Sequence, residues 1–110
     1  MAPKSMAPRR HNDPPVLILT SLADGPKHGH ALIKDIAAFA GTTLGPGALY
    51  GAITRLEEQG LIEPLRPVDR RRPYRITAAG SAALADVVRD MHRVSAVAAA
   101  RLGVPLGVTG

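Results

Sequence analysis

The sequence of 110 residues contains no cysteine and no tryptophan, and aromatic residues make up only 3% of it. The lack of cysteine excludes disulfide frameworks, thiolate metal sites and cysteine nucleophiles. The scarcity of aromatic side chains argues against a platform on which single-stranded nucleic acid stacks. No apolar run approaches the roughly 18 residues of a membrane span, and the basic start lacks the apolar centre of a secretory signal. We therefore expect one small cytoplasmic domain that does not contact membranes.

Positive charge is concentrated in one short segment of a chain whose net charge is +5. Residues 66–77 contain five arginines and a single carboxylate, that of Asp69. Such a cluster favours a polyanionic partner. The alternative is a solvated loop that aids solubility, and charge alone leaves both interpretations open. Residues 1–13 are polar, basic and without periodicity, which predicts a disordered tail.

Hydrophobic periodicity predicts three helices in the first part of the chain, over residues 14–23, 28–40 and 46–59. Apolar residues of the second and third helices recur at i, i+4 and i+7, which is typical of a helix with one buried face. Gly41 and Gly60 provide the stops. The expected inner-face residues are Leu32, Ile36 and Phe39 in the second helix and Leu49, Ile53 and Leu56 in the third.

A β-hairpin and a long helix are expected to follow. Residues 61–66 and 74–77 predict two short strands, and the arginine-rich residues between them form the tip of the hairpin. Pro64 cannot donate to a β-ladder, so its strand is an edge strand or is interrupted there. Thr77 is suited to cap an alanine-rich helix over 78–102. Residues 103–110 are expected to be a flexible tail.

The last helix carries an apolar seam with the 3, 4, 3, 4 spacing of coiled coils. A helix of 25 residues is about 37 Å long, which exceeds the unit that it would cover. We therefore expect this helix to mediate a homodimer, although the alternative is that the seam covers the protein's own core. The seam consists of Leu84, Val87, Met91, Val94 and Ala98.

Three short helices followed by a hairpin is the order of a winged helix-turn-helix, in which the third helix enters the major groove of double-stranded DNA. The fold class is therefore mainly α with a small β-hairpin: a winged helix-turn-helix over 14–77 and a long C-terminal helix. Opposite its inner face, the third helix presents small or polar residues, and no carboxylate precedes Glu57. Arginines at the hairpin tip are placed to neutralise phosphates. The expected DNA contacts are Gly47, Tyr50, Gly51, Thr54 and Arg55 in the third helix, Arg70, Arg71 and Arg72 in the wing, and Lys27 and His28 at the start of the second helix.

Residues 44–63 (LGPGALYGAITRLEEQGLIE) closely resemble the PadR family of bacterial transcriptional regulators, as do residues 27–33 and 74–80. The resemblance covers about residues 15–85 and implies a dimeric winged-helix repressor that often responds to a small molecule. It also implies that the tyrosine matching Tyr50 contacts the DNA backbone. Ala78 stands where the family usually has a proline. Relatives that sandwich flat drugs do so between tryptophans, which this chain lacks.

Catalytic and metal-binding patterns are not evident. His28 and His30, taken as helical, would lie about 200° apart and could not share a metal. No nucleophile motif surrounds a serine, and Gly45-Pro46-Gly47 is not a phosphate-binding P-loop. We therefore expect no enzyme, no metal and no cofactor. The alternatives are a winged-helix module that binds a protein and not DNA, and a small-molecule-binding or enzymatic dimer.

Overall fold

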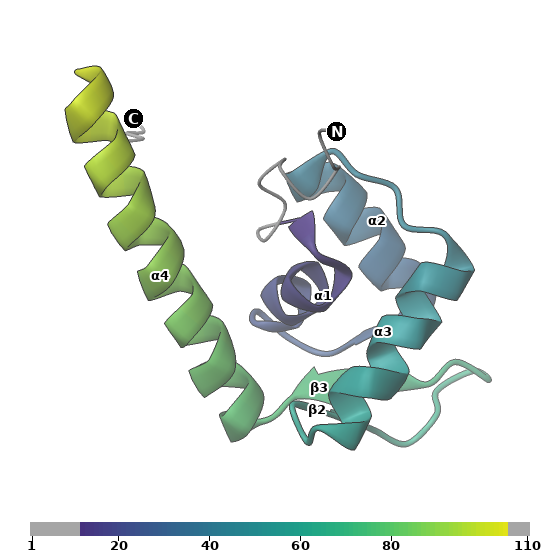
Figure 1. The fold of residues 1–110 in the computed structure, drawn as a ribbon. Coiled ribbons are helices and arrows are strands. Elements are labelled where there is room, and N and C mark those ends of the chain that lie inside the picture. The colour runs from purple at the N-terminus through teal and green to yellow at the C-terminus, as the bar shows by residue number, and fades with distance from the viewer. Residues whose placement is uncertain (1–11, 106–110) are drawn as a thin grey trace, which may run out of the picture.

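The computed structural model describes residues 12–105. The predicted tail over 1–13 therefore lies almost entirely outside the described residues, as does most of the tail predicted over 103–110. Four helices and three short strands make up the described part (Figure 1). In chain order they are α1 (Pro14–Leu22), β1 (Lys27–His28), α2 (Gly29–Ala40), α3 (Pro46–Glu58), β2 (Ile62–Pro64), β3 (Pro73–Ile76) and α4 (Ala78–Leu102).

Helix α1 is the centre of the core, and Figure 1 shows it enclosed by α2, α3 and the sheet. It begins with two prolines, whose missing N–H groups would have no helical partner there. Its sequence is apolar nearly all round, as expected for a helix that other elements cover on several sides. The buried residues of this helix are Leu17, Ile18, Leu19, Ser21 and Leu22.

Helices α2 and α3 pack on α1 through the predicted faces, with one exception. Leu32 and Ile36 of α2 are fully buried, as are Leu49, Ile53 and Leu56 of α3. The prediction for Phe39 is wrong, because 47% of its surface is exposed. Phe39 has the right angular position, but it lies in the last turn of α2, where residues 12–105 cover only about half of its surface.

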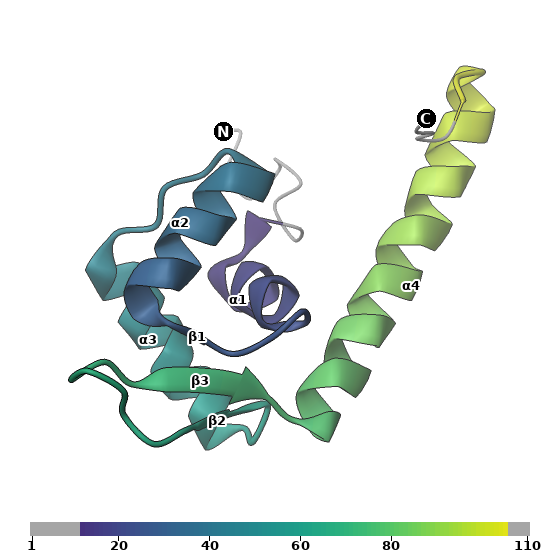
Figure 2. The same cartoon turned by 180° about the vertical axis from the view of Figure 1, so that it is seen from behind.

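The three strands form one antiparallel sheet in the order β1-β3-β2. Pro64 lies in β2, which is an edge strand as the sequence predicted. Strand β1 was not predicted: Lys27 pairs with Tyr74, and His28 pairs with Pro73 (Figure 2). Lys27 and His28 therefore precede α2 as a strand, and the prediction that they begin the helix is wrong. His28 is the N-cap of α2.

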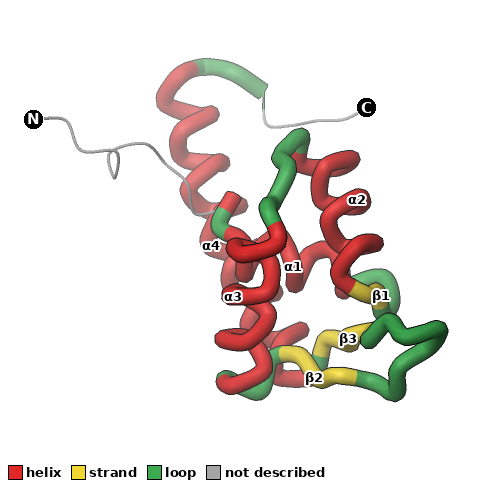
Figure 3. Tube along the Cα trace, turned by 90° about the vertical axis from the view of Figure 1, so that its right-hand side faces the viewer, coloured by secondary structure: helices red, strands yellow, loops and turns green. Residues whose placement is uncertain are grey.

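The loop between β2 and β3, which we call the wing, extends beyond the strands on the side where β1 lies (Figure 3). Its tip is a tight turn closed by two backbone hydrogen bonds between Val68 and Arg71, of 2.8 and 2.9 Å. The two central residues, Asp69 and Arg70, both have positive φ, of 51° and 67°. Neither is glycine, so the turn is strained, but its twist matches that of the hairpin.

Helix α4 leaves the sheet and stands away from the helical bundle (Figures 1 and 2). The Thr77 hydroxyl caps it by accepting the N–H of Gly80, and Gly103 ends it in the left-handed conformation, both as the sequence predicted. Gly80 is the one buried residue of this helix. Within the part of the chain that the structure describes, no helix combines the length and the apolar character needed to cross a membrane.

Candidate nucleic-acid interface

The outward face of α3 is open to solvent. Gly47, Gly51, Thr54 and Arg55 are all exposed. A methyl group added at Gly47 or Gly51 would meet no atom within 4 Å. The first turn of the helix contains no acidic residue, and no side chain caps it. Another backbone can therefore approach this face closely, as a groove-entering helix requires.

Tyr50 lies on the flank of α3 and reaches the start of α2. About half of its surface is exposed. A Cβ atom at Gly29 would lie 2.1 Å from the Tyr50 Oη atom, so only glycine leaves room for the phenol there. Sequence reasoning missed Gly29, because the contact joins residues that are far apart in the chain.

A basic cleft of about 360 Å³ separates the wing from α3 and the start of α2. Its wall includes Tyr50 from α3, Tyr74 from β3 and three consecutive wing arginines. None of its lining residues carries a carboxylate. The structure thus brings together residues that the sequence assigned separately to helix and wing, and their charge suits an anion. The predicted residues around the cleft are His28, Tyr50, Arg70, Arg71 and Arg72.

The arginines of the wing segment differ in what they contact. Arg75 pairs with Glu63 of the neighbouring strand, and the Nη1 atom of Arg72 donates to the Leu65 carbonyl at 2.8 Å. The Nη1 atom of Arg71 lies 3.3 Å from the Nε2 atom of His28. Arg70 occupies the strained tip. Arg71 and Arg72 therefore have contacts within the protein, while the side chains of Arg70, Arg71 and Arg72 all remain exposed to solvent.

His28 and His30 lie close together, contrary to the sequence-based estimate. Their rings stack with centroids 6.4 Å apart and planes 11° from parallel. The estimate of about 200° assumed that both residues were helical, whereas His28 precedes the helix in an extended conformation. The Nδ1 atom of His28 accepts a hydrogen bond of 3.3 Å from the Ala31 N–H. His30 also lines the cleft, a role that the sequence did not indicate.

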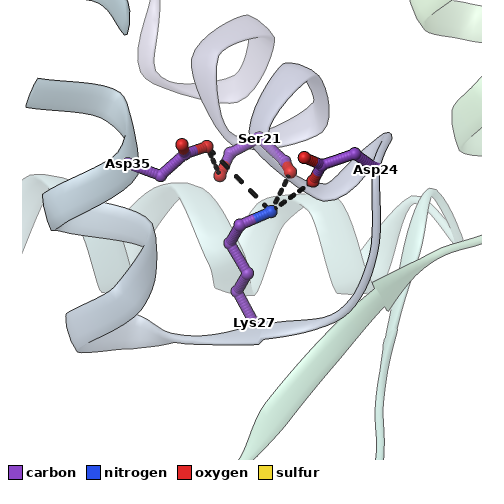
Figure 4. A network of polar contacts seen from close by, with 4 residues as sticks. All are labelled: Ser21, Asp24, Lys27 and Asp35. Carbon is purple, nitrogen blue, oxygen red and sulfur yellow. Dashed lines mark hydrogen bonds and ion pairs between the residues drawn. The ribbon is translucent and has the colours of Figure 1, made fainter. Parts of the chain in front are cut away.

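Lys27 does not line the basic cleft, and its side chain points into a polar network with Ser21, Asp24 and Asp35 (Figure 4). Its ammonium donates to the Ser21 carbonyl and pairs with Asp24, and Asp35 lies 4.0 Å away. The Ser21 hydroxyl completes the network by donating to Asp35 at 2.6 Å. Lys27 therefore ties the end of α1 to β1 and α2, an arrangement that does not fit the predicted phosphate contact. The hydrogen bond from Lys27, together with its charge, lowers the pKa of Asp24 below the ordinary value.

Tyr74 is the buried member of the cleft. Burial in the core raises the pKa of its phenol above the ordinary value, and the charge of Glu57 acts in the same direction. Because the neutral phenol is favoured, Tyr74 adds no negative charge to the basic cleft.

A central helical unit, an exposed third helix and an arginine-tipped hairpin beside it together define a winged helix-turn-helix protein. The chain belongs to the PadR-like family of transcriptional regulators, whose family model matches residues 18–86. It is a transcriptional regulator of that family, and the sequence-based resemblance is confirmed.

A regulator from Mycobacterium tuberculosis and a solved structure from Eggerthella lenta agree with this assignment. The chain is 38% identical over 81 residues to the transcriptional regulator Rv3488 of Mycobacterium tuberculosis, covering 71% of this chain and 75% of the relative. It is 45% identical over 86 residues to a 37.1 kDa protein in transposon TN4556 of Streptomyces fradiae; the match covers 78% of this chain but spans only 25% of that protein's length. A PadR family regulator structure from Eggerthella lenta superimposes with a TM-score of 0.67 at 30% identity, covering 84% of each chain.

Proposed function

We propose that the protein is a DNA-binding repressor, in which α3 enters the major groove and the wing holds the adjacent phosphates. The observation that carries the proposal is the basic cleft, where Tyr50 of α3 and three wing arginines line one carboxylate-free surface. Thr54 and Arg55 are the residues on the open face of α3 that read base edges. The wing arginines contribute affinity that does not depend on sequence.

The alternative of a winged helix that binds only a protein is less well supported. A docking face for a protein partner would tolerate carboxylates, because no polyanion has to approach it. The first turn of α3 and the lining of the basic cleft contain none. This charge pattern favours a nucleic acid over a protein as the partner.

The dimer is proposed to form through α4. This helix has 25 residues, and Gly80 is its single buried residue. Leu84 packs against the core of the same chain, but several apolar side chains further along α4 are exposed. Val94, for example, is 64% exposed. Val88 and Val97 are also exposed and extend the apolar surface beyond the predicted seam of Leu84, Val87, Met91, Val94 and Ala98. A second copy provides the simplest partner for such a helix.

The two-fold symmetry of the proposed dimer predicts the form of its DNA site, the operator. Two copies of α3 that enter successive major grooves on one face of DNA lie roughly 34–36 Å apart. We therefore propose an inverted-repeat operator with half-site centres one helical turn apart. A protein bound there blocks access to the promoter, which makes repression the proposed outcome.

Release of the repressor by a small molecule is part of the proposal and rests on the family resemblance. A suitable place is an apolar cleft of about 330 Å³ between the first turns of α4 and the end of α1. Its lining includes Ala23, Ile76, Leu84 and Val88. A ligand seated there would contact the dimerisation helix and the winged domain together, so it could change the spacing of the two α3 helices.

Selection of bound duplexes from fragmented genomic DNA, followed by footprinting, tests the proposal. We expect an inverted repeat, protection of two successive major grooves, and lower transcription from a promoter that carries the site. Arg55→Ala should weaken the sequence preference, because a bidentate base contact contributes about 1–3 kcal/mol of discrimination. Lys34→Ala is the matched control, since Lys34 is an exposed cation of α2 that does not line the basic cleft. Binding that is weak and equal for all fragments would refute the proposal.

A further inference from the structure

The cap of α2 indicates which ring nitrogen of His28 carries the hydrogen. The Nδ1 atom of His28 accepts the backbone N–H of Ala31, so this nitrogen must be bare. An imidazolium carries a hydrogen on both ring nitrogens and would place an N–H against an N–H. A neutral ring that makes this cap carries its hydrogen on Nε2.

The contact between His28 and Arg71 then joins two donors. The Nε2 atom of His28 lies 3.3 Å from the Nη1 atom of Arg71. A guanidinium group has N–H donors and no acceptor. With the hydrogen of His28 on Nε2, neither group can accept from the other. An anionic oxygen placed within hydrogen-bond distance of both nitrogens would satisfy the two donors together.

The surroundings of this pair suit a phosphate. The two residues lie in the wall of the basic cleft, whose volume of about 360 Å³ accommodates one. Arg70 and Tyr50 line the same space, and none of its lining residues carries a carboxylate. Asp69 lies in the wall of the adjoining cavity that His28 and Arg71 also line. Tyr50 is held beside His28 by its close approach to Gly29.

We propose that His28 Nε2–H and the Arg71 guanidinium together hold one backbone phosphate of the bound DNA. This inference rests on the proposed DNA-binding function and assigns a specific role to a residue that the sequence placed only near the interface. Because the same imidazole caps α2 and faces the wing, the phosphate connects the two elements. The wing is then positioned on the DNA by the helical domain and not by its own charge alone.

The tautomer of His28 provides a test that requires no DNA. Nitrogen-15 NMR of the histidine rings in the full chain at pH 8 should show the hydrogen of His28 on Nε2. A hydrogen on Nδ1 would overturn the proposal, because Nε2 would then accept from Arg71 and both groups would be satisfied internally. Addition of a duplex that the wild-type protein binds should shift the Nε2 signal. A shift with inorganic phosphate but not with the duplex would also overturn the proposal, since DNA would then not be the occupant.

Affinity measurements separate the two roles of His28, which are hydrogen-bond donor through Nε2 and N-cap of α2. His28→Asn retains an oxygen that can cap α2 but removes the Nε2 donor, and Asn is among the best N-cap residues. We expect an unchanged thermal transition and a loss of duplex affinity of about 10- to 100-fold, the range for a hydrogen bond to a charged group. The salt dependence should be nearly unchanged, because the neutral ring neutralises no charge. His92→Asn, at an exposed position of α4, is the control and should bind as the wild type does.

Arg71→Ala completes the comparison. It should lower the slope of log affinity against log salt by about 0.9 for each subunit, the value for one phosphate, and therefore by about 1.8 for the proposed dimer. The double variant with His28→Asn should lose less affinity than the product of the two single losses, because both groups hold one phosphate. If the two losses simply multiplied, or if His28→Asn bound with wild-type affinity, His28 and Arg71 would not hold one phosphate together. DNA binding itself would still stand. Failure of the wild-type protein to bind any duplex would instead refute the proposed function. A DNA phosphate could then not be the group held by His28 and Arg71.

Discussion

Two glycine-to-alanine substitutions in helices should change stability in opposite directions. Gly80 and Gly51 are both helical, so alanine gains about 1 kcal/mol of helix propensity at either position. A Cβ atom at Gly51 meets nothing within 4 Å, so Gly51→Ala should realise this gain. A Cβ atom at Gly80 would lie 2.0 Å from the Leu61 carbonyl oxygen and 2.8 Å from a side-chain carbon of Ile76.

An added Cβ at Gly80 would be strongly destabilising because its nearest neighbour is a backbone oxygen and not a flexible side chain. The Leu61 carbonyl also accepts the Thr77 N–H at 3.0 Å, so moving it strains the junction between β3 and α4. Overpacking costs about 1–3 kcal/mol, and a weakened hydrogen bond adds about 1 kcal/mol. After the propensity gain, we expect Gly80→Ala to lower the free energy of unfolding by about 1–3 kcal/mol.

Thermal and urea denaturation followed by circular dichroism, at one fixed protomer concentration, measure this difference. One kcal/mol corresponds to roughly 4–8 °C in Tm for a domain of this size. Gly51→Ala should therefore melt several degrees above the wild type and Gly80→Ala several degrees below it. A Gly80→Ala protein as stable as the wild type, or a destabilised Gly51→Ala protein, would refute the packing described for these helices.

Three further outcomes are expected. Gly51→Ala, although more stable, should bind duplex DNA several-fold more weakly by fluorescence anisotropy, because its methyl group lies between α3 and the groove; unchanged affinity would place Gly51 outside the interface. Val94→Asp should dissociate the proposed dimer in sedimentation velocity, while Ser95→Asp, at the exposed neighbouring position, is the control and should not. If both variants remained dimers, the α4 seam would not be the dimer interface. Tyr50→Phe leaves Tyr74 as the one tyrosine, and burial raises its pKa, so its absorbance titration should have a midpoint above 10.0. The stability contributed by the neutral phenol is present below pH 10.0 and is lost as the pH rises through the raised pKa; a midpoint at or below 10.0 would contradict this.

The sequence predicted the helices of the fold because their signals are local. The i, i+4, i+7 spacing in α3 and the left-handed stop at Gly60 both depend on neighbouring residues alone. The cap at Thr77 and the end at Gly103 are local in the same way. Phe39 shows the limit of this reasoning, since periodicity gives the face of a helix but not the extent of the elements that cover it.

The missed features are contacts between distant segments. Strand β1 has two residues and no period, so its pairing with β3 leaves no pattern in the sequence. Lys27 is different, because its partner Asp24 is close in the sequence: the turn after α1 brings Asp24 and the Ser21 carbonyl to the ammonium, and α2 adds Asp35. The approach of Tyr50 to Gly29 and the contact of His28 with Arg71 are equally non-local. Residue type predicted the chemistry of the site, but only the fold brings its members to one cleft.

The central claim is that the wing neutralises phosphates while α3 occupies the groove. Its most direct test is the salt dependence of duplex affinity for the wild-type protein and for the variant with Arg70, Arg71 and Arg72 all replaced by alanine. Each lost phosphate contact reduces the slope of log affinity against log salt by about 0.9, so we expect a reduction of about 2–3 per subunit and about 4–6 for the proposed dimer, whose two wings both lose their arginines. Parallel lines for the two proteins would contradict the account, because the wing arginines would then contact no DNA.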